Sequence, residues 1–234
     1  MTTIGVLGLD TTFTKIPGHI RNPVTFCFPV VVEVVAGATA RRVVQEADPA
    51  LLGPFIDAAR NLEAAGAAAI TSACGFLAMF QREMAAAVDV PLYASSLIQV
   101  PMVHRMLRPD QKVGVLTASA ASLSARHLEA VGAADVPVSV AGMEAQPEFR
   151  EVMLEARRPG LDVARLRAEV LSVAVQLIHD DPDIGALVIE CTDLVPFAAD
   201  IQAASGLPVF DIVTLTEMVH HALTRHPYAG RQES

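Results

Sequence analysis

The sequence predicts an α/β protein of two pseudo-twofold-related halves, each with a mostly parallel sheet, and a cleft between the halves. Three observations predict this fold. Short apolar runs alternate with helical patterns along nearly the whole chain. The composition is 52% hydrophobic and 18% charged, which suits strands that helices bury on both faces. The second part of the chain also repeats the first, so we expect one half at 1–95 plus 210–234 and the other at 96–209.

The elements follow one another in a regular order. Eight runs rich in Val, Ile and Leu predict strands, at 4–9, 30–35, 68–73, 92–95, 112–117, 136–141, 186–190 and 207–212. Eight segments with helical spacing of apolar residues predict helices, at 54–65, 77–88, 97–107, 122–131, 148–156, 161–179, 194–205 and 214–224. This alternation is typical of βαβ units. Residues 225–234 lose the periodicity, and we expect them to fray.

One long segment, 10–29, interrupts the alternation between the first two strands. It contains three prolines and a glycine and has no helical period. Loops of this length inside compact domains are usually functional or disordered, so we expect this one to fold over a site, with a plain connector as the alternative. Within it, Arg21 could clamp a carboxylate, whereas His19 and Arg21 could equally be solvated loop residues.

The repeat brings two cysteines into register. Residues 68–77 align with residues 185–194 at an offset of 117 residues, which places Cys74 opposite Cys191. The same offset, without a gap, also pairs two phenylalanines and two prolines further on. Each cysteine ends an apolar strand and precedes a helix, at the sheet edge where open α/β proteins bind their ligands. We therefore expect both sulfur atoms to flank one cleft.

The chemistry of such a cleft follows from the helix ends. A cysteine at a helix N-terminus has its thiol pKa lowered by the dipole and by unpaired N–H groups. The N–H groups at Gly75, Phe76, Thr192 and Asp193 could hold a substrate carboxylate. One sulfur on each face of the α-carbon would suit proton removal on one face and return on the other, as in a racemase. A reducible disulfide or two inert core thiols are the alternatives.

Composition excludes several other classes. The net charge of −9 argues against nucleic acid and anionic membranes as partners. No apolar run approaches the roughly 20 residues of a membrane span, and the first residues lack a signal-peptide pattern. Three cysteines are an odd number, and no metal-ligand spacing or Gly-rich phosphate loop is present. We therefore expect a cytoplasmic homo-oligomeric enzyme, with no cofactor or metal, that acts on a small carboxylate.

The two cysteine segments, Thr-Ser-Ala-Cys-Gly at 71–75 and Glu-Cys-Thr-Asp at 190–193, resemble the aspartate/glutamate racemase superfamily. This superfamily includes aspartate, glutamate and hydantoin or allantoin racemases, arylmalonate decarboxylase and maleate cis–trans isomerase. The resemblance spans almost the whole chain. It implies two α/β halves around a cleft, no cofactor, and both cysteines as acid and base.

The resemblance also implies roles for residues near the strand ends. Asp10 matches a polar residue that would assist Cys74, Thr117 matches a position that contacts the substrate carboxylate, and Ser119 lies close to it. Asp193 stands where glutamate racemases have His, which is closer to aspartate racemases. We therefore expect an amino-acid racemase, for a substrate such as aspartate or glutamate.

Other functions stay open at this point. The first is a hydantoin or allantoin racemase. The second is a maleate-type isomerase or an arylmalonate-type decarboxylase that uses a nucleophilic cysteine. A binding protein with two lobes would also fit the fold, but the paired cysteines and the missing signal peptide disfavour it.

Overall fold

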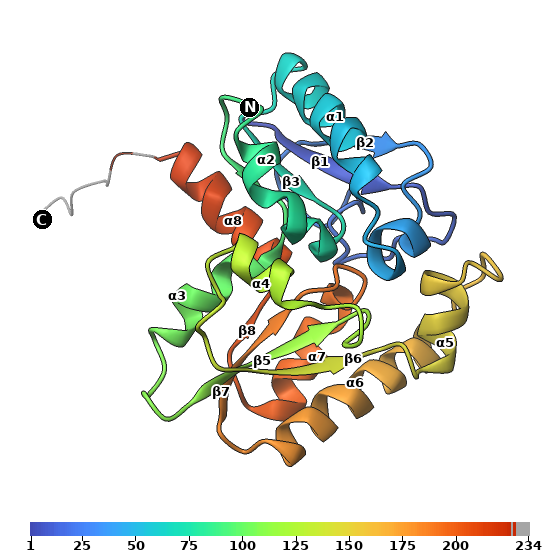
Figure 1. The fold of residues 1–234 in the computed structure, drawn as a ribbon, viewed down its shortest axis with the longest axis vertical. Coiled ribbons are helices and arrows are strands. Elements are labelled where there is room, and N and C mark those ends of the chain that lie inside the picture. The colour runs from blue at the N-terminus through green and yellow to red at the C-terminus, as the bar shows by residue number, and fades with distance from the viewer. Residues whose placement is uncertain (226, 228–234) are drawn as a thin grey trace, which may run out of the picture.

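The computed structural model describes residues 1–225 and 227, and its strands form two four-stranded parallel sheets (Figure 1). The strand orders, β2-β1-β3-β4 and β6-β5-β7-β8, are the same in both sheets. This confirms the predicted α/β fold with two similar halves. The strands are β1 (Ile4–Leu9), β2 (Val30–Val35), β3 (Ala69–Ser72), β4 (Leu92–Tyr93), β5 (Lys112–Thr117), β6 (Val138–Gly142), β7 (Ile184–Ile189) and β8 (Val209–Phe210).

Helices connect the strands and cover the sheets. They are α1 (Leu52–Ala64), α2 (Gln81–Ala85), α3 (Val100–His104), α4 (Ala125–Ala130), α5 (Pro147–Phe149), α6 (Val163–Asp180), α7 (Ala198–Ser205) and α8 (Ile212–Leu223). Shorter helical turns are η1 (Arg41–Gln45), η2 (Pro49–Leu51), η3 (Gly75–Phe80), η4 (Ser96–Gln99), η5 (Arg150–Leu154) and η6 (Val195–Phe197). The continuous helices expected at 77–88 and 97–107 are wrong in detail, because 3-10 turns η3 and η4 precede α2 and α3. At α3 the reason is Pro101, which is tolerated only in a first helical turn.

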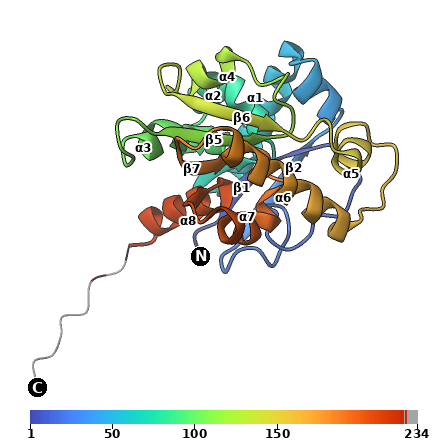
Figure 2. The same cartoon turned by 90° about the horizontal axis from the view of Figure 1, so that it is seen from below.

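The central strands of the second sheet, β5 and β7, are buried on both faces, as their apolar residues predict. On one face, Val113 and Val115 of β5 pack with Val100 and Val103 of α3. On the other face, Leu116 joins the main core, to which α6 also contributes. Figure 2 shows α6 and α7 along this second face. Successive side chains of a strand point to opposite faces, so β5 needs apolar residues throughout.

Hydrogen bonds tie the two halves together. Gln99 Nε2 donates to the carbonyl of Asp211 at 2.9 Å. Ser96, at the start of the second half, donates through its hydroxyl to the carbonyl of Ile189 in the same half at 2.7 Å. The chain returns to the first half at α8, which packs against β3 (Figure 1). Thr192 makes another bond between the halves, which lies in the site described below.

Two expectations about the chain as a whole can be compared with the structure. No helix of the described residues combines the length and the apolar content that crossing a membrane requires. The expected fraying at 225–234 lies outside the described residues, except for 225 and 227.

Candidate active site

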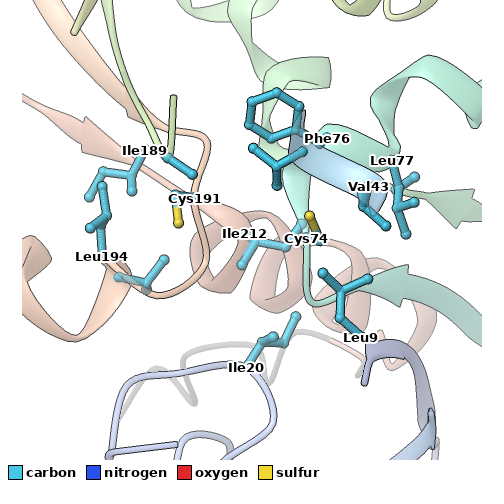
Figure 3. Packing of buried hydrophobic residues seen from close by; sticks show 14 of the residues in the cluster. Leu9, Ile20, Val43, Cys74, Phe76, Leu77, Ile189, Cys191, Leu194 and Ile212 are labelled. Atoms are coloured by element: carbon cyan, nitrogen blue, oxygen red, sulfur yellow. The ribbon is translucent and has the colours of Figure 1, made fainter. Parts of the chain in front are cut away.

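A cavity lies at the carboxyl ends of the central strands of both sheets. Leu9 ends β1, Cys74 follows β3, Ala118 follows β5 and Cys191 follows β7, and all four line this cavity. It encloses about 470 Å³ of empty space, part of it open to solvent. Both cysteines are buried and free, and Figure 3 shows them on facing loops of the two halves. The structure thus brings the repeated cysteines to one cavity.

Aromatic and aliphatic side chains form most of the remaining wall. They include Phe13 from the long loop, Phe76 after Cys74, and Phe149 and Met153 from α5 and η5. Such a wall, with a few ionisable groups set into it, is typical of a small-molecule site. Among the described residues, no three His, Cys, Asp or Glu side chains converge as metal ligands would.

Four of the predicted binding residues lie on this wall, namely Gly75, Phe76, Thr192 and Asp193. The hydroxyl of Thr192 is already used, because it donates to the carbonyl of Ala73 at 2.7 Å. This hydrogen bond also joins the two halves. Thr192 therefore closes the cavity between the two sheets.

Asp10, Thr117 and Ser119 are not among the residues that line the cavity, so the roles expected for them stay predictions. Asp10 is exposed, and its Oδ2 accepts from the backbone N–H of Gly37 at 3.0 Å. Ser119 is paired with the hydroxyl of Ser122 at 3.0 Å. Thr117 donates to a carboxylate instead, which is described below. A strand end fixes where a residue lies along the sheet edge, but it does not fix where its side chain points.

The thiols are not activated as the helix ends predicted. Burial raises the pKa of Cys74, and Glu190 adds to this. Burial also raises the pKa of Cys191, followed by Asp193 and Glu190. The backbone N–H groups of Phe76 and Leu77 oppose the shift at Cys74, and that of Asp193 opposes it at Cys191. These N–H groups therefore face the sulfur atoms, and desolvation outweighs them.

Glu190 is the functional candidate that sequence reasoning missed. Its side chain is 1% exposed, and Oε2 accepts a hydrogen bond from Thr117 Oγ1 at 2.6 Å. Oε1 is buried without a hydrogen-bond partner among the described residues. Burial raises the pKa of Glu190 to about 7, although the Thr117 hydroxyl opposes this. Its position in the sequence, directly before the strand-end cysteine Cys191, was the signal that could have indicated Glu190.

The long loop 10–29 brings a cluster of charges to the cavity. Lys15 Nζ lies 3.6 Å from Asp193 Oδ1, and His19 Nε2 lies 3.2 Å from the same oxygen. His19 is 2% exposed, so it is not a solvated loop residue. Arg21 lines the cavity and its Nη1 donates to the carbonyl of Leu9 at 2.9 Å. The loop therefore covers the site, as expected.

Asp193 is the centre of this charge cluster. Burial alone would raise its pKa, but Lys15 and His19 together lower the pKa of Asp193 to about 2. The backbone N–H of Arg21 donates to His19 Nδ1 at 3.0 Å, so a neutral His19 ring carries its proton on Nε2, which faces Asp193. Burial lowers the pKa of both Lys15 and His19. Asp193 is thus held ionised by its own partners, and it is not free to serve Cys191.

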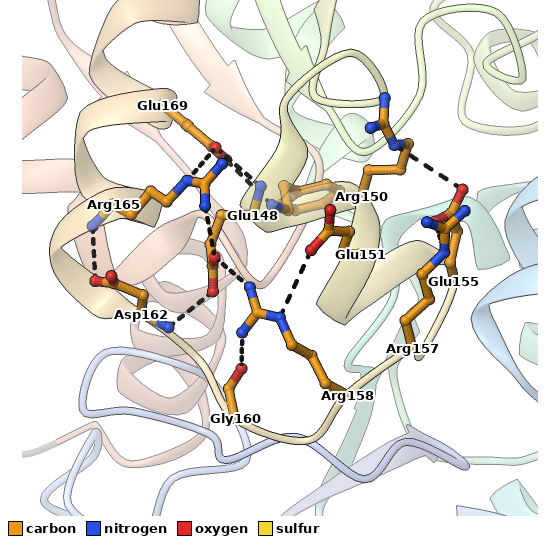
Figure 4. Close-up of polar contacts among 11 residues, drawn as sticks. Glu148, Arg150, Glu151, Glu155, Arg157, Arg158, Gly160, Asp162, Arg165 and Glu169 are labelled. Carbon is orange, nitrogen blue, oxygen red and sulfur yellow. Dashed lines mark hydrogen bonds and ion pairs between the residues drawn. The ribbon is translucent and has the colours of Figure 1, made fainter.

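A network of ion pairs anchors the outer wall of the cavity (Figure 4). Glu148, which is fully buried, pairs with Arg158 and accepts from the backbone N–H of Asp162 at 2.8 Å. Glu169 on α6 accepts from the backbone N–H groups of Glu148 and Phe149 at 2.9 and 3.1 Å. These contacts tie α5 and η5, which carry Phe149 and Met153, to α6.

Comparisons with known proteins bear on what this site does. The family model described as Asp/Glu/Hydantoin racemase matches residues 29–217. A dimethylsulfoniopropionate lyase of Durusdinium sp. clade D is 31% identical over 235 residues, covering 97% of this chain and 77% of that protein. Dimethylsulfoniopropionate lyases 5 and 7 of Emiliania huxleyi are 31% and 30% identical over 97% of this chain, which spans 46% and 69% of their respective lengths.

Solved structures show the same fold. Unliganded arylmalonate decarboxylase has a TM-score of 0.60 and 17% sequence identity, with both chains covered completely. A glutamate racemase isoform from Bacillus anthracis has a TM-score of 0.59 and 17% identity, covering 94% of this chain and 82% of that one. At this identity the likeness concerns the fold alone.

The names of the relatives correct the expected reaction. The sequence analysis predicted a racemase, and therefore an isomerase, and that prediction is wrong, because relatives that match almost the whole chain are named lyases. The hydantoin racemase, isomerase and decarboxylase alternatives did not include this reaction either. Fold and paired cysteines alone do not distinguish a lyase from a racemase, because one fold can host different reactions.

Proposed function

We propose that this chain, which belongs to the Asp/Glu/Hydantoin racemase family, is a lyase that cleaves a small carboxylate bearing a sulfonium group. The observation that carries the proposal is the shared name of relatives about 30% identical over almost the whole chain. The first substrate to test is dimethylsulfoniopropionate, which their names give.

Elimination is the chemistry that this substrate allows. A base removes a proton from the carbon next to the carboxylate, and the C–H electron pair forms a C=C bond. The adjacent C–S bond breaks, and its electron pair leaves with sulfur. The zwitterion thereby yields neutral dimethyl sulfide, acrylate and one proton held by the base.

The cavity offers groups suited to each part of this reaction. Cys74 and Cys191 are the candidate bases, because both lie on the cavity wall and backbone N–H groups face their sulfur atoms. Arg21 lies within reach of a substrate carboxylate. The aromatic rings of Phe76 and Phe149 on the cavity wall suit a sulfonium cation.

The reaction needs fewer proton transfers than racemisation. A racemase must remove a proton from one face of the α-carbon and return a proton to the other face, so it uses two acid/base groups. Elimination of a neutral sulfide returns no proton to carbon. One of the two cysteines therefore suffices as the base.

The test is direct assay of purified protein with dimethylsulfoniopropionate. We expect equal amounts of dimethyl sulfide in the headspace and acrylate in solution, at rates well above buffer. The thioether 3-(methylthio)propanoate is the matched substrate control. It lacks the positive charge, and its leaving group, methanethiolate, is poorer than dimethyl sulfide, so it should give no acrylate. Failure to form either product at saturating substrate would contradict the proposal.

A further inference from the structure

We propose that Glu190 is the counter-charge for a positively charged group of the ligand, so that the cavity selects zwitterionic carboxylates over anionic carboxylates of the same shape that lack the cation. The proposed function supplies the chemical identity of that group, a sulfonium. The charge preference itself comes from the placement of Glu190.

The geometry leaves one oxygen of Glu190 unpaired at the cavity wall. Thr117 holds Oε2, whereas Oε1 has no hydrogen-bond partner among the described residues. Oε1 lies against Gly75, where an added Cβ would come within 2.3 Å of it. Gly75 itself lines the cavity. Glu190 also lines the cavity, and its carboxylate packs against the backbone of Gly75 because that residue has no side chain.

The other carboxylate on the cavity wall, Asp193, already has cationic partners. Asp193 forms ion pairs with Lys15 and His19. Asp193 and Asp10 also oppose the lowering of the Arg21 pKa by burial. Asp193 raises the pKa of Glu190, and Glu190 raises the pKa of Cys74 and Cys191. None of these three neighbouring groups is a cation. Among the described residues no lysine, arginine or histidine forms an ion pair with Glu190. A buried carboxylate without a partner is unfavourable, and a cationic ligand would relieve it.

The two ends of a zwitterion then have separate partners. Arg21 is held against the end of β1 in the first half, and Glu190 follows β7 in the second half. A ligand with a carboxylate and a cation two carbons apart would offer one charged group to each of these residues. The class of ligand is therefore a short β-sulfonio or β-ammonio carboxylate.

Proton exchange gives a readout that a purely structural role would not produce. The pKa of Glu190 is about 7, so it titrates near neutral pH. Asp193 titrates far below and both thiols well above this range, while burial lowers the pKa of His19. A cationic ligand favours the carboxylate form, so binding near pH 7 should release a proton from Glu190. If only the carboxylate form binds, affinity should rise about tenfold between roughly pH 6 and pH 8.

The experiment compares two unreactive ligands of equal shape by titration calorimetry in buffers of different ionisation enthalpy. They are 3-(trimethylammonio)propanoate, which has a poor leaving group, and 4,4-dimethylpentanoate, in which carbon replaces the charged nitrogen. We expect the zwitterion to bind more tightly, with proton release and the pH dependence above. The anionic analogue, which brings no cation to Glu190, should show no proton release and no rise of affinity with pH.

Glu190→Gln should abolish both the preference and the proton release, while the anionic analogue still binds, which reports that the site is folded. Glu144→Gln is the matched control, because Glu144 also has a buried unpartnered oxygen but lies outside the cavity wall. Charge preference without proton exchange in the wild type, or an unchanged preference in Glu190→Gln, would overturn the inference. A protein that shows the coupling but cleaves no dimethylsulfoniopropionate would refute the proposed function alone, and a lyase without the coupling would refute only this inference.

Discussion

Burial decides the state of Cys74 and Cys191 more than the backbone around them does. Both thiols are inside the protein, near carboxylates, and their raised pKa keeps them protonated at neutral pH. Two backbone N–H groups face the sulfur of Cys74 and one faces that of Cys191. The thiolate is therefore easier to form at Cys74, and a bound cation would assist it further.

This predicts the reactivity of each thiol without ligand. Iodoacetamide should label Cys74 and Cys191 slowly near neutral pH and faster as the pH rises above about 9, with Cys74 ahead of Cys191. Cys27 is exposed and serves as an internal control that labels readily. Peptide mass spectrometry against time and pH gives the three rates. Fast labelling of Cys74 that does not change between about pH 6 and pH 9 would contradict the raised pKa.

A second prediction separates a lyase from a two-base enzyme. One of the variants Cys74→Ser and Cys191→Ser should lose at least about a hundredfold in kcat, as expected for removal of a general base. The other should stay within about tenfold, because elimination requires one base. The measurement is the initial rate of acrylate formation. Equal and severe losses in both variants would show that both thiols transfer protons.

The Asp193 cluster makes an acid-stability prediction. Its folded pKa of about 2 lies below the unfolded value near 3.9, so its contribution is fully present above about pH 4 and is lost as pH falls through about 2. Asp193→Asn leaves Lys15 and His19 buried without their partner, and we expect a loss of about 3 kcal/mol at neutral pH. Urea melts between about pH 2 and pH 7 should show the two proteins converging in acid. Asp200→Asn, which breaks an exposed pair with Arg167, is the control and should change stability much less.

At the scale of elements, the short helix α5 and turn η5 depend on contacts from α6. Their first backbone N–H groups have no partner within the helix, and Glu169 of α6 supplies one. Phe149 and Met153 on the same segment form part of the cavity wall. The segment is therefore held in place from outside the site.

Glu169→Ala should loosen this segment. Two buried N–H groups would lose their acceptor, which costs about 2 kcal/mol or more. We expect faster hydrogen exchange across 147–162 and a higher KM, with a smaller change in kcat. Gln176→Ala, on the exposed face of the same helix, is the control. An increase in exchange spread evenly over the whole chain would instead indicate general destabilisation.

At the scale of the whole molecule, the main core is continuous across both sheets. Buried residues of β1 and β3 belong to the same cluster as buried residues of β7 and α6. The expected division at 95/96 and 209/210 stays a prediction, as do the homo-oligomer and the cytoplasmic location. A shared core predicts that neither half is stable alone.

Thermal unfolding should therefore be one cooperative transition. Calorimetry should give equal calorimetric and van't Hoff enthalpies, and circular dichroism should report the same midpoint. Proteolysis of the native protein should not release a stable fragment of 96–209. Two resolved transitions, or such a fragment, would show that the halves fold independently.

The sequence by itself determined the strands, the repeat and the equivalence of Cys74 and Cys191. These depend on local periodicity and on spacing, which the chain carries in its order of residues. The sequence also predicted that the loop 10–29 covers the site, because loops of that length inside a domain are usually functional or disordered. The reaction class came from neither source, since one fold and one pair of cysteines serve several reactions.

Only the tertiary structure decided the charges of the site. The pairing of Lys15 and His19 with Asp193, and the contact of Glu190 with Gly75, join residues that are distant in the chain. The raised pKa of the thiols has the same origin, because desolvation is produced by both halves closing over the cysteines. A helix dipole is a local property and can be predicted from sequence, whereas burial is a property of the packed molecule and here outweighs the dipole.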